Sequence, residues 1–279
     1  MTMDSVRPDS YRRFYEEVGE KYPEEEIVYR TLKGRLRRAF VLKCLSSWTG
    51  RLLDVGCNRG MYLKAYKGGE KVGVDLSWHA LKKIRDRGDD TPLAVADAGA
   101  LDCFRDGVFD VVLCSEVLEH VVHPDRVLEG MHRLLVPGGH ALVTTPNYRD
   151  GRPDWAEVGM MKAYGVHGME GDRYYHTAFR PEELARMGEG VGFHAVEMGT
   201  LEKEIKYASK MPLVLFHLSN FLNRMTVQSP AWTVFNQRLY DGMMLGIYRL
   251  IKGIGLHSFF IRWISEGVRT YVIFEKPRS

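Results

Sequence analysis

The chain has 279 residues, of which 45% are hydrophobic and 27% charged, and its formal net charge is +3. This composition is ordinary for a soluble protein, and the length allows one domain with additions. The charge is uneven: residues 51–200 carry 18 Lys/Arg against 23 Asp/Glu, whereas residues 201–279 carry 11 against five. The basic C-terminal part favours an anionic partner surface, and the alternative is a solvated helix face.

The cysteines exclude a disulfide framework and a zinc site of the usual spacing. Cys44, Cys57, Cys103 and Cys114 form no Cys-x-x-Cys pair, which favours a reducing compartment. The polar N-terminal stretch has no apolar h-region, and no run approaches the ~20 apolar residues of a spanning helix. We therefore expect a cytoplasmic protein that is either free or associated with a membrane surface.

Residues 9–47 are predicted to form two helices before the first strand. Apolar residues recur at helical spacing, and acidic residues at 24–26 precede basic ones up to Lys43, which suits the helix dipole. Four tyrosines of this segment either face a substrate or pack on the core: Tyr11, Tyr15, Tyr22 and Tyr29.

Residues 51–60 predict the opening of a nucleotide-binding βαβ unit. A short apolar run ends at Asp54, turns through Gly56 to Gly60, and continues into a predicted helix over residues 60–67. Glycines in such a turn let the backbone approach a ligand closely, and the helix N–H groups can meet its polar groups.

The next three predicted strands also end in acidic or small polar residues. Residues 71–77 place Asp75 19 positions after Gly56, the interval expected for a carboxylate that accepts from two ribose hydroxyls. Residues 93–98 end at Asp97, and residues 109–115 run into Glu116. Because these strand ends meet at one edge of a parallel sheet, they predict one ligand crevice.

The remaining chain predicts three further strands and a long loop. Strands are expected at residues 140–145, 192–196 and 269–275, with a helix that begins at Pro181 between the first two. Residues 148–175 show no period and predict a long loop near the active site.

Residues 201–266 read as an apolar, Met-rich and net basic helical insertion before the last strand. One interpretation is a helical cap on the sheet, and a second is a surface for a hydrophobic substrate or an anionic membrane. A dimer interface is a third, compatible with either. Peripheral membrane contact would then involve residues 205–264.

Five segments resemble, in order, those of class I S-adenosylmethionine-dependent methyltransferases: residues 54–60, 73–77, 96–98, 109–120 and 135–139. Over about residues 48–200 the chain is most similar to the group of ubiquinone-biosynthesis O-methyltransferases, the methyltransferase type 11 group. That family usually has Gly where this chain has Asn58, a residue that tolerates left-handed backbone angles. A dinucleotide dehydrogenase is disfavoured, because the Gly-x-Gly-x-x-Gly spacing is missing.

The resemblance implies an α/β fold with a Rossmann-like, seven-stranded, mostly parallel sheet and helices on both faces. It divides the chain into an N-terminal helical lid (1–47), a cofactor-binding core (48–200 and 267–279) and the insertion (201–266). The final strand is expected to be antiparallel.

The resemblance also assigns the S-adenosylmethionine site. Asp54, Gly56, Cys57 and Gly60 would hold the methionine part, with a backbone carbonyl from Ser115. Asp75 would take the ribose hydroxyls, Leu76 the adenine face, and Asp97 with Ala98 the adenine amino edge. The alternative for Asp75 and Asp97 is a structural role at strand ends.

Glu116, Glu119 and His120 follow the fourth strand at a spacing that would place all three on one helical face. With His176 they form a candidate site for Mg²⁺ or Mn²⁺, as in small-RNA 2′-O-methyltransferases that the motif resembles. His120 and Glu116 are the candidate catalytic residues. Otherwise Glu116 and Glu119 structure the loop while His120 alone acts as general base without metal, or none of these residues reacts.

The favoured function is O-methylation of a small-molecule or lipid-linked acceptor by in-line methyl transfer. One alternative is a metal-assisted RNA 2′-O-methyltransferase, but nucleic acid is disfavoured because no RNA-binding module or aromatic–basic stacking surface is found. The other is a cofactor-binding scaffold without turnover, against which the intact Asp54, Gly56 and Asp75 speak. The choice among O-, N- and C-methylation and the oligomeric state stay open.

Overall fold

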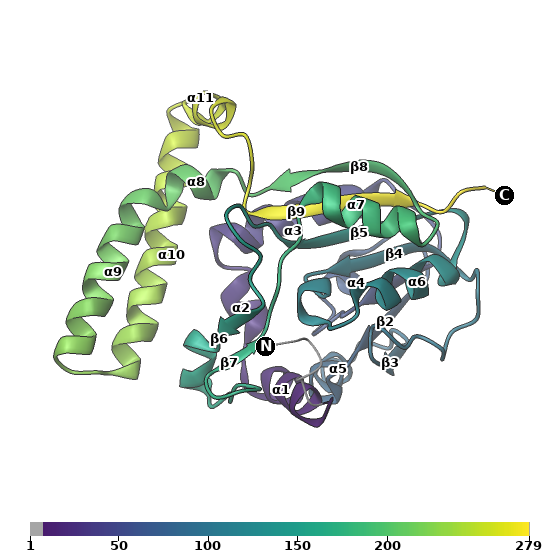
Figure 1. Ribbon diagram of the computed structural model, residues 1–279, viewed down its shortest axis with the longest axis horizontal. Helices are drawn as coiled ribbons and strands as arrows, with labels where there is room; N and C mark the ends of the chain where they lie inside the picture. The colour runs from purple at the N-terminus through teal and green to yellow at the C-terminus, as the bar shows by residue number, and fades with distance from the viewer. Residues whose placement is uncertain (1–7, 279) are drawn as a thin grey trace.

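The computed structural model describes residues 8–278, so the ends of the predicted lid (1–7) and core (279) lie outside it. Its centre is a seven-stranded sheet in the order β3-β2-β1-β4-β5-β9-β8 (Figure 1). The strands of this sheet are β1 (Leu52–Val55), β2 (Lys71–Asp75), β3 (Leu93–Val95), β4 (Phe109–Ser115), β5 (Leu135–Pro146), β8 (His194–Leu201) and β9 (Arg269–Glu275).

Helices cover both faces of the sheet and precede it in the chain. The helices of this part are α1 (Pro8–Lys21), α2 (Glu24–Val28), α3 (Leu32–Ser46), α4 (Met61–Ala65), α5 (Trp78–Arg85), α6 (Pro124–Leu134) and α7 (Pro181–Gly190). Pro23 separates α1 from α2, and Thr31 caps α3, so three helices occupy the segment predicted to hold two.

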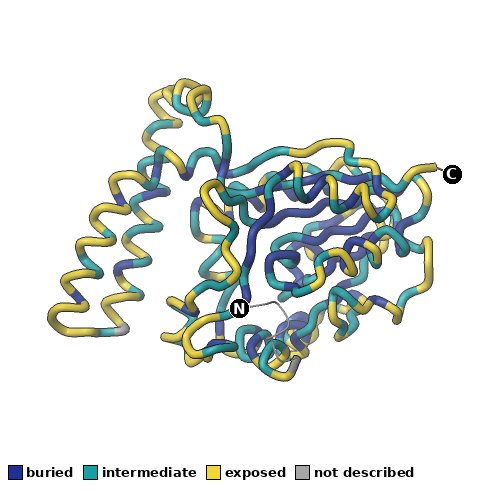
Figure 2. The backbone as a smooth tube through the Cα atoms, viewed as in Figure 1, coloured by how far each residue is buried: buried dark blue, intermediate teal, exposed yellow. Residues whose placement is uncertain are grey.

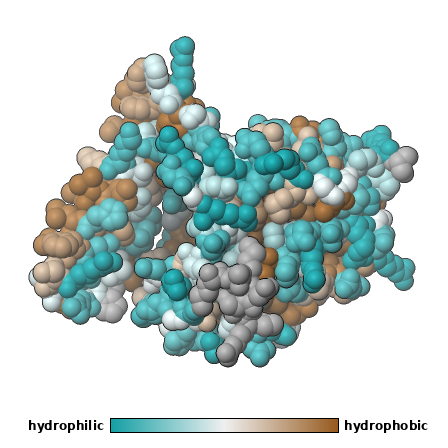
Figure 3. Space-filling view, viewed as in Figure 1, coloured by the Kyte–Doolittle hydropathy of each residue, from teal (hydrophilic) through white to brown (hydrophobic). Residues whose placement is uncertain are grey.

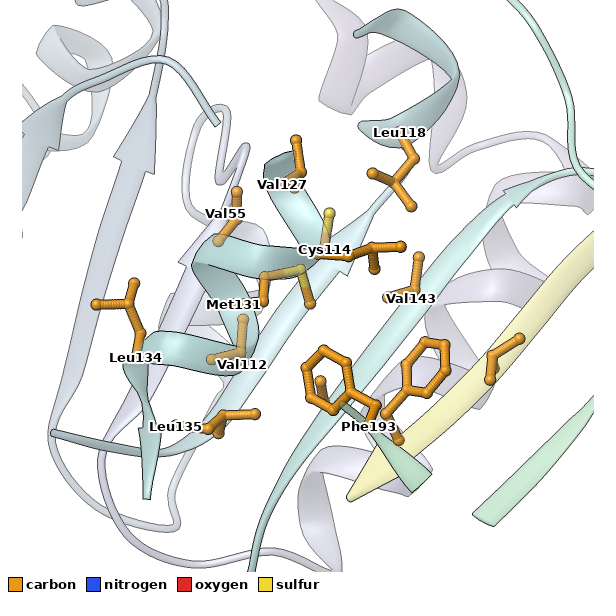
Figure 4. Packing of buried hydrophobic residues seen from close by; sticks show 14 of the residues in the cluster. Val55, Val112, Cys114, Leu118, Val127, Met131, Leu134, Leu135, Val143 and Phe193 are labelled. Atoms are coloured by element: carbon orange, nitrogen blue, oxygen red, sulfur yellow. The ribbon is translucent and has the colours of Figure 1, made fainter. Parts of the chain in front are cut away.

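Alternate side chains of the central strands pack into two separate hydrophobic cores, one on each face of the sheet. On one face Val55, Val112 and Cys114 pack against α6 and α7 (Figure 4). On the other, Leu52, Val111 and Leu113 pack against α3, α4 and α5. Because side chains alternate along a strand, burial on both faces requires the continuous apolar runs seen in the sequence. These central strands are the most buried part of the chain (Figure 2).

Among the strands of this sheet, β9 runs opposite to its two neighbours. β9 pairs antiparallel with β5 and with β8, with Val143 opposite Val272 and Met198 opposite Val272 on the other side. The predicted antiparallel final strand and the seven-stranded mixed sheet are therefore confirmed.

Residues 148–175 contain regular structure, and the prediction of a loop without elements was wrong. A two-stranded sheet pairs β6 (Trp155–Glu157) with β7 (Arg173–Tyr175), and a 3₁₀ helix η3 (Gly159–Tyr164) joins them. Strands of three residues are too short to show a two-residue period, which explains why no pattern in residues 148–175 marked them.

The segment between β8 and β9 forms a helical projection at one side of the sheet (Figure 1). It contains α8 (Glu204–Ala208), α9 (Lys210–Met225), α10 (Pro230–Gly253) and α11 (His257–Arg262). α9 and α10 pack side by side as a hairpin. Met244 anchors α10 against Leu32 of α3 and Ile205 of α8. None of the described helices is long and apolar enough to cross a membrane.

Candidate active site

A cavity of about 570 Å³ lies at the carboxyl ends of β1, β2 and β4, beneath α1 and α2. Ligands of open α/β folds bind at this edge, because the loops there diverge to either side. The predicted cofactor residues that line the cavity are Asp54, Gly56, Cys57, Asp75, Leu76, Asp97, Ala98 and Ser115. Asp97 and Ala98 follow β3, which ends at Val95 and is shorter than predicted.

The glycine turn has the left-handed backbone that its residues permit. Gly56, Asn58 and Gly60 have φ values of +70°, +47° and +75°. Asn58 is therefore accommodated in the conformation that its family's glycine would adopt. Gly60 is not among the lining residues of the cavity, because it stands at the N-cap of α4 and its N–H donates to the Cys57 carbonyl at 2.8 Å. Its role is to shape the turn.

Two carboxylates, those of the buried Asp54 and the partly buried Asp75, face the cavity next to this turn. Asp54 is 1% exposed, and its Oδ2 has no hydrogen-bond partner among the described residues. Burial, followed by the charge of Asp75, raises the pKa of Asp54 well above its usual range. A buried carboxylate without a partner is costly, so this oxygen fits a cationic or hydrogen-donating ligand.

Asp75 is held by backbone groups on both of its oxygens. The N–H of Asn58 donates to Oδ2 at 2.8 Å, and the N–H of Ser77 donates to Oδ1 at 2.9 Å. Burial raises the pKa of Asp75 to about 6, although these two hydrogen bonds oppose the shift. Asp75 therefore orders the turn and also lines the cavity, so the structural role considered from the sequence does not exclude the predicted ribose contact.

The N-terminal helices are fastened over the cavity by polar contacts. Glu16 of α1 accepts from the Ser77 hydroxyl at 2.9 Å and from the Trp78 N–H at 3.1 Å, at the start of α5. Arg59 donates to the Tyr22 carbonyl at 2.6 Å, and the Asn58 side-chain amide donates to Glu24 of α2. All four predicted substrate-facing tyrosines, Tyr11, Tyr15, Tyr22 and Tyr29, line the cavity.

Three of the four proposed metal ligands converge on the cavity wall. Glu119, His120 and His176 each offer one ligand atom, and these atoms lie within 4.8 Å of one another. Glu119 Oε2 and His120 Nδ1 are buried and have no hydrogen-bond partner within residues 8–278. Burial, followed by the charge of His176, lowers the pKa of His120 to about 3, so its imidazole is neutral. Neutral imidazole and a partnerless carboxylate oxygen form a donor set suited to a divalent cation.

Glu116 is separated from this group by its backbone and by its partners. Its φ is +62°, and only residues 118–120 form a 3₁₀ helix, so the predicted common helical face does not exist. The Glu116 carboxylate pairs with Arg37 and, at 2.5 Å, with Arg269. Thr144 donates to its other oxygen at 3.0 Å. The paired carboxylate joins α3, the end of β4 and β9, and Glu116 also lines the cavity.

Several cavity residues were missed by reasoning from the sequence. Arg37, Arg269, Gln237 and Asp241 line the cavity, although they come from α3, β9 and α10. None belongs to a local motif, and their convergence follows from the path of the chain. Only the polar residues of α10, which interrupt its apolar spacing, could have signalled that this helix has a face toward the cavity.

The cavity fits S-adenosylmethionine in chemistry and in position. The partnerless Asp54 oxygen suits a positively charged group, and Asp75 stands where a ribose binds in folds of this topology. The left-handed turn between them brings backbone, without bulky side chains, to the cavity.

Comparison with known sequences identifies the family. Residues 53–143 match the family described as a methyltransferase domain. The ubiquinone biosynthesis O-methyltransferase of Thiobacillus denitrificans is 34% identical over 159 residues, 53% of this chain and 66% of that protein. The Methylococcus capsulatus protein of the same name is 29% identical over 200 residues, 62% of this chain and 80% of that protein. The chain thus spans just under two thirds of the first relative.

Comparison with solved structures supports the fold. Haemonchus contortus phosphoethanolamine N-methyltransferase 2, solved with S-adenosyl-L-methionine, has a TM-score of 0.53 at 18% identity, covering 99% of this chain and 57% of that chain. A structure from a complex of the Haloferax volcanii Trm112 methyltransferase activator reaches 0.55 at 17% identity, covering 98% and 100%. The [4+2]-cyclase SpnF reaches 0.52 at 18% identity, covering 86% and 81%. Structural likeness at this level of identity shows the fold alone, whereas the sequence match shows the family. Through its methyltransferase domain, the chain belongs to the class I S-adenosylmethionine-dependent methyltransferases.

Proposed function

We propose that this protein transfers a methyl group from S-adenosylmethionine to a hydroxyl oxygen of a small-molecule or lipid-linked acceptor. One observation carries the proposal: a single cavity joins the cofactor residues Asp54 and Asp75 to the group of Glu119, His120 and His176. In-line transfer needs donor and acceptor in contact, and a cavity with both kinds of residue on its walls meets that need.

The cofactor end of the cavity orients the methyl donor, whose sulfonium supplies the reactive methyl group. Asp54 offers its partnerless oxygen to the amino group of the methionine part. Asp75 accepts from the ribose hydroxyls, and Asp97 with Ala98 borders the adenine. Leu76 packs on the adenine ring, while Cys57 and the Ser115 backbone close the site on the methionine side.

The acceptor end holds the hydroxyl and its proton. Glu119, His120 and His176 would hold Mg²⁺ or Mn²⁺, which lowers the pKa of a bound hydroxyl. Without a metal, His120 is the candidate base, since its imidazole lies on the cavity wall beside Glu119 and His176. The Tyr15 ring packs edge-on against His120 with centroids 5.6 Å apart, and its buried hydroxyl has no hydrogen-bond partner in the described part of the chain. This hydroxyl can donate to the acceptor oxygen.

The insertion supports a lipid-linked acceptor. α10 places Gln237 and Asp241 in the cavity wall, while its opposite side exposes Phe235 and Leu239 to solvent. A polar headgroup could therefore enter beside Gln237 while its hydrocarbon part stays on the apolar side. To reach an acceptor that is held in a membrane, the protein must contact the membrane surface, and residues 205–264 would make this peripheral contact.

An RNA 2′-O-methyltransferase finds less support. The cavity is lined by nine Asp/Glu and by three Lys/Arg, namely Lys33, Arg37 and Arg269. Two of those three are paired with Glu116. An RNA backbone brings a negative charge with every phosphate, so this lining would repel it.

Calorimetric titration of S-adenosylhomocysteine tests the proposal and separates it from a scaffold without turnover. We expect binding that weakens at least tenfold in Asp54→Asn, with Asp90→Asn as a surface control. Methyl transfer from labelled S-adenosylmethionine to 4-alkylcatechols then tests turnover, and Glu119→Gln should abolish it. Absence of binding at millimolar S-adenosylhomocysteine contradicts the cofactor assignment, and binding without transfer to any hydroxyl acceptor contradicts the O-methyltransferase assignment.

A further inference from the structure

The helical projection exposes an unusual amount of apolar surface. Side chains on α9, α10 and α11 stand in solvent at fractions such as 59% for Phe221, 63% for Phe235 and 77% for Trp263. In Figure 3 the hydrophobic side chains gather over the α9–α10 hairpin at the left of the molecule. Contiguous apolar surface of this extent marks an interaction site in a folded protein.

The charged residues that the same projection exposes are basic. The exposed charged residues of segment 203–264 are Lys206, Lys210, Arg224, Arg238, Arg249, Lys252 and Arg262. Its two acidic residues, Glu204 and Asp241, are only partly exposed, and Asp241 lines the cavity. The outer surface therefore combines apolar side chains with a large excess of positive charge.

This combination decides between the possible partners. A second copy of the chain in a two-fold dimer would place the same basic residues opposite one another, and their repulsion would oppose contact. An anionic lipid surface instead pairs with every basic residue and receives the apolar side chains at its headgroup boundary.

We propose that the surface of α9, α10 and α11 docks on an anionic lipid bilayer. α10 links this surface to the cavity, because Gln237 and Asp241 on its inner side contact each other at 3.3 Å and line the cavity wall. Docking thus brings the acceptor end of the cavity next to the lipid. The inference deepens the proposed function, which supplies the reason for membrane delivery, but docking itself requires no turnover.

Co-sedimentation of the full chain with vesicles tests the proposal. The probes are vesicles of phosphatidylcholine alone and of phosphatidylcholine with 30% phosphatidylglycerol. We expect at least tenfold stronger binding to the anionic vesicles. Vesicle binding should be lost in the triple variant Phe221→Ser, Phe235→Ser, Trp263→Ser. It should be kept in the control variant Val196→Ser, Met198→Ser, because these exposed apolar residues lie on β8, outside the projection.

A charge series completes the test. A triple variant of the projection should bind anionic vesicles about tenfold more weakly: Arg224→Gln, Arg238→Gln, Arg249→Gln. A matched triple variant of exposed basic residues outside the projection should bind them unchanged: Lys64→Gln, Lys67→Gln, Arg105→Gln. Equal binding to both vesicle types, or equal loss in both triples, overturns the proposal. A dimer in light scattering that the apolar variant dissociates, without vesicle binding, overturns it in favour of self-association. S-adenosylhomocysteine titration of the same samples reports separately on the proposed function, since these substitutions lie outside the cofactor residues.

Discussion

The side-chain amide of Asn58 donates a hydrogen bond to the carboxylate of Glu24, and so connects the glycine turn to α2. A glycine at this position would keep the left-handed backbone but could not make the contact. The residue that departs from the family pattern, together with Arg59, therefore ties the N-terminal helices to the cofactor turn. A ligand that leaves by displacing α1 and α2 from this turn must break the Asn58–Glu24 contact.

Replacing Asn58 with Gly should speed ligand release. Loss of one such hydrogen bond costs about 1 kcal/mol, so the dissociation rate of S-adenosylhomocysteine should rise about fivefold. Stopped-flow displacement measures it, and Glu24→Gln should show a change in the same direction. Glu26→Gln on the exposed side of α2 is the control and should leave the rate unchanged. Equal rates in Asn58→Gly and the parent would show that release does not involve this contact.

The affinity for S-adenosylhomocysteine should fall below about pH 6. Asp75 must be ionised to accept two ribose hydroxyls, and burial raises its pKa to about 6. Below that pH Asp75 is protonated in the free protein and must lose its proton before the ligand binds. The dissociation constant of S-adenosylhomocysteine should therefore rise as the pH falls, approaching tenfold per pH unit. Calorimetry from pH 5 to 8 measures the step. Asp75→Asn should bind more weakly and lack it, and a pH-independent parent contradicts the assigned role.

The raised pKa of Asp75 affects the stability of the free protein in the opposite direction from its effect on ligand binding. A raised pKa in the fold means that the folded state binds more protons between the usual carboxyl range and pH 6. The contribution of Asp75 to stability is therefore most favourable at low pH and is lost as the pH rises through 6. Ligand binding and stability of the free protein should consequently respond to pH in opposite directions in this window.

The sequence predicts the sheet well because its strands carry strong local signals. β4 and β9 were placed at their observed bounds, since buried strands of seven residues show clear apolar runs or alternation. The cofactor edge follows from the same signal, because each strand end brings its polar residue to one crevice.

The parts that could not be predicted depend on single backbone angles and on distant contacts. The positive φ of Glu116 directs its carboxylate toward Arg37 and Arg269, and no periodic pattern encodes one left-handed residue. The meeting of residues 37, 116 and 269 reflects how α3 and β9 cross the sheet. Gln237 reaches the cavity for the same reason, because α10 is fixed by packing of Met244 far along the helix.

Glu116→Gln should destabilise the fold far more than loss of a surface ion pair. The Arg37 side chain is 7% exposed and pairs with Glu116, so neutralising the carboxylate leaves a buried positive charge uncompensated. Such losses cost about 3 kcal/mol. Urea denaturation measures the change. Glu70→Gln, which removes an exposed pair with Arg51, should cost at most about 1 kcal/mol. Equal costs would mean that the buried network contributes no more than the surface pair.

Manganese binding should separate the three convergent ligands from Glu116. Glu119, His120 and His176 offer donor atoms within 4.8 Å of one another, whereas Glu116 is held by two arginines that repel a cation. Electron paramagnetic resonance of free Mn²⁺ should show one site that is lost in Glu119→Gln and weakened at least tenfold in His176→Ala. Glu116→Gln should retain the site under conditions where it stays folded. Loss of Mn²⁺ only in Glu116→Gln would place the metal elsewhere. Absence of any Mn²⁺ site would contradict metal-assisted transfer and leave the route in which His120 acts as a base without metal.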